Sequence, residues 1–94
     1  NNKITMLPSC FDKLKSLKEL KLDYNKIGEL PKSFGKLPRL SFLSIISNGM
    51  KKLPPSFGEL KNLDAMYLAY NRFTRDKKTK KWLKETFPNC YFRF

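Results

Sequence analysis

The apolar residues of this chain recur with a period of 23 positions, and no other feature constrains its fold as strongly. Leu-Pro steps stand at 7–8, 30–31 and 53–54, and a phenylalanine follows each proline by three residues. A polar column has the same spacing and consists of Asn2, Asn25, Asn48 and Asn71. A unit of this length cannot bury its apolar side alone, so successive units must stack on one another as the coils of a solenoid.

The repeating unit reads L-x-x-L-x-L-x-x-N-x-[apolar]-x-x-L-P-x-x-F-[G/D]-x-L-x-x, which predicts a short strand followed by a bend. Leu20 and Leu22 flank Lys21, so both leucines face one side of an extended segment and the lysine faces the other. The proline then turns the chain away from the strand. We expect the asparagines to bond backbone groups of their own and the neighbouring coil. We also expect a stacked aromatic spine of Phe11, Phe34 and Phe57.

This motif resembles that of the leucine-rich repeats, and the resemblance extends over residues 2–94. The L-P-x-x-F-G-x-L segment at this spacing is similar to bacterial leucine-rich-repeat proteins, and also to the intracellular Ras-pathway and cell-polarity scaffolds of eukaryotes. The resemblance implies an α/β fold, a right-handed solenoid with short parallel strands on its concave face and loops or helical turns outside. It also implies protein recognition, which is the usual role of the family.

The repeat changes after Phe73, where the Leu-Pro step is missing and a lysine-rich segment follows. Thr74 is a residue type that caps a helix N-terminus and Pro88 is one that ends a helix, so the sequence predicts a helix between them. Leu83 and Phe87 are four residues apart and would share one face of it. This helix and the P-N-C segment after it resemble the cap that closes many bacterial leucine-rich-repeat proteins.

A fourth strand is expected after this helix. If the last repeat is one position longer than the others, Cys90 and Phe92 fall in the columns of Met66 and Leu68. Cys90 is therefore expected to be a small buried side chain. It would lie about three coils of 4.8 Å each from Cys10, which is too far for a disulfide bond.

The whole chain, residues 1–94, is interpreted as one leucine-rich-repeat domain. A partial first repeat (1–16) is followed by repeats at 17–39, 40–62 and 63–73, and by a helix-strand cap at 74–94. Residue 2 already occupies the asparagine column, so the strand of its repeat is missing. We expect the chain to be a fragment of a longer protein, or to self-associate through this uncapped edge.

The composition argues against catalysis. The chain has no histidine, which excludes the usual histidine-based triads and most zinc sites. Glu19 and Asp23 would lie about 13 Å apart on one strand, farther than a glycosidase pair. We therefore expect no enzymatic activity, no cofactor and no metal ion. The sequence has neither a signal-peptide pattern nor an apolar run of about 20 residues, and its compartment stays open between the cell interior and bacterial secretion as an effector.

The side chains between the core leucines would point outward from the concave face, and they vary from repeat to repeat. Aromatic side chains there suit protein contacts, because they bring large area at little entropic cost. The expected apolar contacts are Phe42, Ile46, Tyr67, Tyr70 and Tyr91. The expected charge-setting residues are Glu19, Lys21, Asp23 and Arg93. A plainer interpretation also stands, in which cross-strand aromatic pairs only stabilise the sheet.

The alternative functional surface is the basic segment 72–84. It could bind nucleic acid or an anionic membrane electrostatically, and the chain as a whole has a net charge of +12. Another alternative is purely structural, in which the chain is the terminal piece of a longer repeat array. The seven cations of the basic segment 72–84 are Arg72, Arg75, Lys77, Lys78, Lys80, Lys81 and Lys84.

Overall fold

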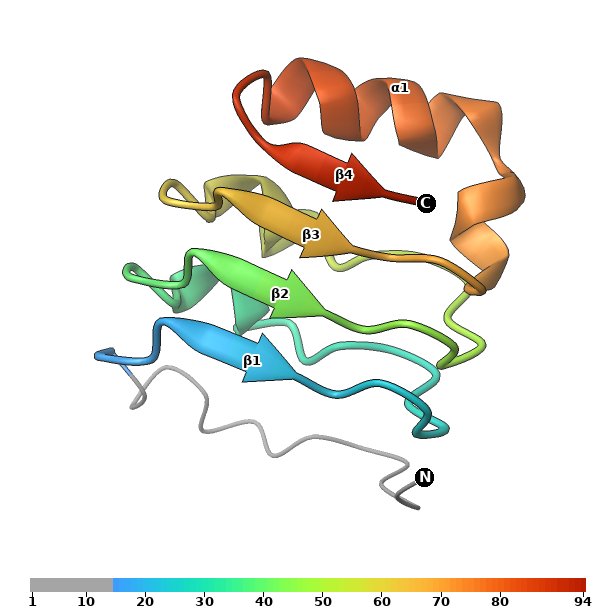
Figure 1. Ribbon diagram of the computed structural model, residues 1–94, viewed down its shortest axis with the longest axis horizontal. Helices are drawn as coiled ribbons and strands as arrows, with labels where there is room; N and C mark the ends of the chain where they lie inside the picture. The colour runs from blue at the N-terminus through green and yellow to red at the C-terminus, as the bar shows by residue number, and fades with distance from the viewer. Residues whose placement is uncertain (1–14) are drawn as a thin grey trace.

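The computed structural model describes residues 15–94, which form stacked coils that each contribute one short strand to a parallel sheet (Figure 1). The sheet order is β1-β2-β3-β4. In the pairing of the first three strands, Leu20 lies beside Leu43, and Leu43 beside Met66. These partners are one repeat apart in the chain, so the repeat seen in the sequence is the register of the sheet. The strands are Glu19–Lys21 (β1), Phe42–Ser44 (β2), Ala65–Tyr67 (β3) and Tyr91–Arg93 (β4).

Helical turns form the other side of each coil. The chain bends at the Leu-Pro steps 30–31 and 53–54, where Phe34 N–H donates to the carbonyl of Pro31 (3.0 Å) and Phe57 N–H to that of Pro54 (2.9 Å). Helix α1 covers the end of the sheet next to β4 (Figure 1). No helix within residues 15–94 is both long enough and apolar enough to cross a membrane. The helices are η2 (Phe34–Lys36), η3 (Pro55–Glu59), η4 (Arg72–Arg75) and α1 (Lys77–Thr86).

The core lies between the sheet and these helices. Leu43 and Met66 face it from the strands and are fully buried. The rings of Phe34 and Phe57 stack at 6.0 Å with 8° between their planes, which confirms the aromatic spine for these two residues. Phe87 from the cap continues it with an edge-on contact to Phe57 at 5.9 Å. Phe11 lies outside the described residues.

The buried asparagines join neighbouring coils, as predicted. Asn48 Nδ2 donates to the carbonyl of Ile45 in its own coil (3.0 Å) and to that of Leu22 in the preceding coil (2.9 Å). Its Oδ1 accepts from Ile27 N–H at 3.2 Å. Asn71 repeats the pattern with the carbonyls of Leu68 and Ile45. Each amide therefore satisfies buried backbone groups that the turn leaves without partners. Asn2 lies outside the described residues.

The residues that precede Asn25, Asn48 and Asn71 have a left-handed backbone. Tyr24, Ser47 and Tyr70 have φ of 59°, 60° and 59°. This conformation is uncommon for residues other than glycine, and it turns the chain sharply at the end of the strand. One consequence is that Tyr24 and Tyr70 point away from the core, with 56% and 80% of their surface exposed.

The start of the cap helix differs from the prediction. Thr74 does not cap α1, because it lies inside η4, and its hydroxyl donates to the carbonyl of Asn71 (2.6 Å). Asp76 is the N-cap instead, and its carboxylate accepts from Lys78 N–H (3.0 Å) and the Thr79 hydroxyl (2.9 Å). The extra 3-10 turn keeps Thr74 from the capping position. The helix ends at Thr86, before Pro88, as predicted.

The register of the last strand also differs. Met66 pairs with Phe92, whereas the sequence predicted Cys90 as its partner. The connection from β3 to β4 is therefore longer than predicted, and the extra length is the distance along the chain from Cys90 to Phe92. A helix advances only about 1.5 Å per residue, so a helical connection uses more residues than an extended one. Tyr91 therefore lies beside Ala65, and Arg93 beside Tyr67. Because the slip is an even number of positions, every side chain of β4 keeps its predicted face.

Candidate functional site

Three aromatic side chains form a continuous row across the concave face of the sheet, which points away from the core. The rings of Phe42 on β2 and Tyr67 on β3 meet edge to face at 5.0 Å and 83°. Tyr67 meets Tyr91 on β4 in the same way, at 6.4 Å and 73°. Edge-to-face contacts at this separation are favourable and hold the rings in fixed orientations. We call Phe42, Tyr67 and Tyr91 the concave aromatic row.

Two of these rings each have a cationic side chain packed against them. Lys21 Nζ is 5.7 Å from the centre of the Phe42 ring, and the Arg93 guanidinium is 5.1 Å from that of Tyr67. Both distances are in the range of cation–π attraction. The row therefore combines apolar area with positive charge. Glu19 is exposed and pairs in register with Phe42, so it adds a carboxylate at the β1 edge.

Asp23 has a structural role. Its Oδ1 accepts from the hydroxyl of Ser44 (2.6 Å) and from Ile46 N–H (2.7 Å), which ties the end of β1 to the neighbouring coil. Ser44 is buried as a result, with 2% of its surface exposed. The side chain of Ile46 is half-buried. A contact of Asp23 or Ile46 with a partner remains a prediction.

Tyr70 lies beyond the end of β3, and no ring contact joins it to the concave aromatic row within residues 15–94. It lines a cleft of about 600 Å³ together with Arg72, Arg75 and Phe94. The site residues predicted from the sequence are therefore arranged as one aromatic row and a separate exposed tyrosine.

The cations of the segment 72–84 are spread over two elements. Arg72 and Arg75 lie on η4, and the five lysines lie on α1. Lys80 and Lys84 pack over the ring of Phe94 at 5.2 and 5.7 Å. These two cations stabilise the contact between α1 and the end of the chain, so the segment is only partly a free basic surface.

Comparison with known proteins gives the family. A family model described as leucine rich repeat matches residues 1–50, which is more than half of the chain. The chain belongs to the leucine-rich-repeat family. A search of curated proteins gave no match. Leucine-rich-repeat domains are generally protein-interaction modules and are typically non-catalytic, and no catalytic family matched.

A solved leucine-rich-repeat protein of Leptospira interrogans has the same fold. It superposes with a TM-score of 0.91 at 36% identity over 99% of this chain. The alignment covers 23% of that protein, so this chain spans about a quarter of the length of its bacterial relative. The expected leucine-rich-repeat solenoid of parallel strands and helical turns is confirmed.

Within residues 15–94, no group of His, Cys, Asp and Glu side chains is placed to hold a metal ion. Cys90 is half-buried rather than buried, because Phe92 takes the core position predicted for it. Burial, and secondarily the charge of Asp64, raise the pKa of the Cys90 thiol from 9.0 to about 11. A thiol with a raised pKa is a poor nucleophile.

Alkylation by iodoacetamide should therefore distinguish folded from unfolded Cys90. At pH 8 we expect Cys90 to react at least about tenfold more slowly in the native protein than in urea, because its thiolate fraction is lower. Because of the raised pKa, the folded state keeps the thiol proton to a higher pH than the unfolded state does. Cys90 therefore lowers the free energy of unfolding as the pH rises from 9.0 toward about 11. Mass spectrometry of the Cys90 peptide gives the rate, and equal native and unfolded rates would contradict this assignment. The variant Asp64→Asn should raise the native rate only slightly, because burial is the larger cause.

Proposed function

We propose that this chain binds a partner protein through the concave face of its sheet. The observation that carries the proposal is the concave aromatic row with its two cations. Tyrosine, tryptophan and arginine are enriched at the residues that dominate binding energies. The proposed apolar contacts are Phe42, Ile46, Tyr67, Tyr70 and Tyr91. The proposed charged contacts are Glu19, Lys21, Asp23 and Arg93.

The competing explanation is that the row only stabilises the sheet. Cross-strand aromatic pairs contribute about 0.2–1 kcal/mol each, so a stabilising role would appear as a loss of stability when a ring is removed. A binding role would appear as a loss of affinity in a protein that remains folded. Both quantities must therefore be measured on the same variants.

The test is an affinity capture from lysate with the wild type and the double variant Ile46→Asp/Tyr67→Ala. We expect a protein that the wild type retains through a high-salt wash and that the double variant loses, by at least about tenfold in affinity. The matched control is Asn89→Asp/Pro38→Ala, which makes the same charge change and one side-chain truncation at exposed loop positions. Circular dichroism and urea unfolding show that each variant is folded.

Other outcomes would redirect the function. A capture that survives in the double variant but disappears with salt or nuclease would assign binding to the basic segment 72–84, as electrostatic recognition of nucleic acid or membrane. Capture of the same proteins by all three chains, independent of salt and nuclease, would contradict a role for the concave face. That result would favour a purely structural piece of a longer array.

A further inference from the structure

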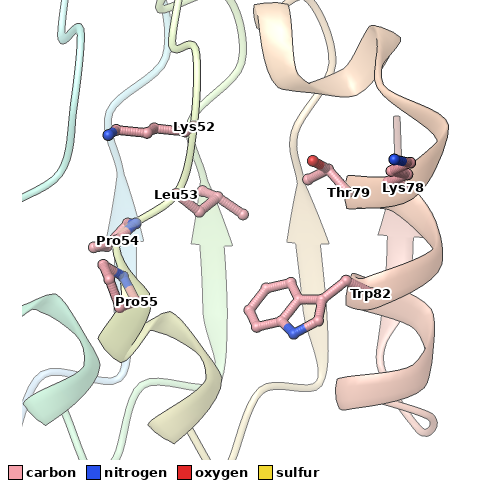
Figure 2. A pocket seen from close by; sticks show the side chains of 7 residues that line it. All are labelled: Lys52, Leu53, Pro54, Pro55, Lys78, Thr79 and Trp82. Atoms are coloured by element: carbon pink, nitrogen blue, oxygen red, sulfur yellow. The ribbon is translucent and has the colours of Figure 1, made fainter.

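A second recessed surface lies on the outer side of the coils, where α1 faces the Leu-Pro turn of the preceding repeat. It is a groove of about 280 Å³ formed by η3, the chain before it and one face of α1, with the strands behind it (Figure 2). No strand residue lines it, so it is separate from the concave aromatic row. We call it the Trp82 groove, and its lining residues are Lys52, Leu53, Pro54, Pro55, Lys78, Thr79 and Trp82.

The apolar floor of this groove is held in place before any ligand arrives. Trp82 has 40% of its surface exposed, yet its ring is packed edge-on against Phe87 at 6.4 Å and 83°. It also lies over Gly58, where a Cβ atom would come within 3.3 Å of Trp82 Cζ2. Figure 2 shows the indole extending from α1 toward Pro54 and Pro55. A fixed ring loses little conformational entropy on binding, so it is a pre-organised apolar contact.

The rims of the groove are positively charged. Lys52 lies on one side and Lys78 on the other, and the lining contains no acidic residue. The Lys52 side chain extends away from Trp82 (Figure 2), toward an adjoining recess that Glu29 also lines. Both lysines are exposed. Exposed lysine side chains are long and flexible, so both ammonium groups are accessible to a ligand. Lys78 and Trp82 are four residues apart on α1, so they share one face of the helix.

We propose that the Trp82 groove docks an acidic peptide segment of a partner protein. The segment places a proline or aliphatic side chain on Trp82 and Pro55, with acidic residues on either side reaching Lys52 and Lys78. The volume is below the 300–1,000 Å³ or so of small-molecule sites, and it suits one or two side chains of an extended chain. Aromatic-lined grooves accept extended segments that contain proline, because a polyproline II segment is already ordered and costs little entropy to bind.

Trp82 is the single tryptophan of the chain, so its fluorescence reports on this groove alone. The probe is an acetylated and amidated peptide with a central Pro-Leu pair and three glutamates on each side. Titration into the full chain should give a saturable change in emission that weakens as ionic strength rises from about 0.05 M to about 0.5 M. Replacing Pro-Leu by Gly-Ser in the peptide should abolish the change without altering the protein. The absence of any saturable binding of the first peptide, by fluorescence or calorimetry, overturns the proposal.

Charge reversal at the rims tests the geometry. Lys52→Glu/Lys78→Glu should lower peptide affinity at least about tenfold. The matched control, Lys18→Glu/Lys61→Glu, makes the same change in net charge at exposed positions outside the groove and should lower it far less. An equal loss in both pairs means non-specific attraction and overturns the proposal.

Two further arms separate this groove from the other surfaces of the chain. Ile46→Asp/Tyr67→Ala should bind the peptide as the wild type does, which keeps this result independent of the concave face. If it abolishes peptide binding, the site is the concave face and the proposal fails. A thymidine oligonucleotide that binds through Lys52 and Lys78 where the acidic peptide does not would likewise replace the proposal by nucleic-acid binding.

Discussion

Replacing Gly35 by alanine should destabilise the protein by at least about 3 kcal/mol, or prevent it from folding. A Cβ atom on Gly35 would overlap the carbonyl oxygen of Ser56 and lie 2.6 Å from its carbonyl carbon. These are backbone atoms of the neighbouring coil, so no side-chain rotation relieves the overlap. Gly35 N–H also bonds Ser56 Oγ at 3.0 Å, and separating the coils would break this bond. Urea unfolding followed by circular dichroism measures the loss.

Gly58 provides the matched control, because it occupies the same position in the next repeat. A Cβ atom there would meet only side-chain atoms, the nearest being Trp82 Cζ2 at 3.3 Å. Trp82 is 40% exposed, so its ring edge can shift by a few tenths of an ångström while the ring keeps its contact with Phe87. Gly58→Ala should therefore change stability by less than about 1 kcal/mol. If the two alanine variants prove equally mild, the tight approach of η2 to η3 is not a condition of the fold. The comparison of Gly35→Ala with Gly58→Ala therefore tests how closely η2 and η3 must pack.

The repeat columns predicted the parts of this fold that depend on position alone. A side chain that recurs once in every repeat meets its own equivalent in the next coil, so the column gives the register of β1 to β3. The stacking of Phe34 on Phe57 follows from the same fact. So does the hydrogen bonding of Asn48 and Asn71, since each amide meets the same backbone groups in its turn.

The cap was less predictable because it departs from the repeat. The sequence indicated Thr74 as the capping residue, and a 3-10 turn over residues 72–75 moved the cap to Asp76. The length of the helical connection then moved Tyr91 to the position beside Ala65 rather than beside Tyr67. The concave aromatic row survived because this slip keeps each side chain on its face.

The Trp82 groove had no signal in the repeat pattern. Trp82 and Pro54 belong to different columns and are far apart in sequence, and only the direction of α1 brings them to one groove. Nothing in the sequence identified the prolines that Trp82 faces. Sites built between a repeat and its cap depend on tertiary packing in this way, whereas sites along the sheet follow the columns.

Removing the amide of Asn48 should destabilise the protein by about 3–5 kcal/mol. Asn48→Ala leaves the buried N–H of Ile27 without its acceptor, and removes the donor to the carbonyls of Leu22 and Ile45. Each unsatisfied buried group costs about 1–3 kcal/mol, and the groups span two coils. Urea unfolding followed by circular dichroism should show the loss as a lower midpoint with an unchanged slope.

The variants Asn48→Asp and Asn62→Ala separate hydrogen bonding from packing. Asn48→Asp keeps the shape and the acceptor for Ile27, but directs a carboxylate at carbonyl oxygens, so it should cost at least as much as Asn48→Ala. A cavity explanation predicts the reverse order, because aspartate fills the same volume. Asn62 is exposed and donates one bond, to the Pro38 carbonyl at 2.5 Å, so Asn62→Ala should cost less than about 1 kcal/mol. A loss at Asn48 no larger than the loss at Asn62 would mean that the coils are held together by their apolar core and not by the asparagines.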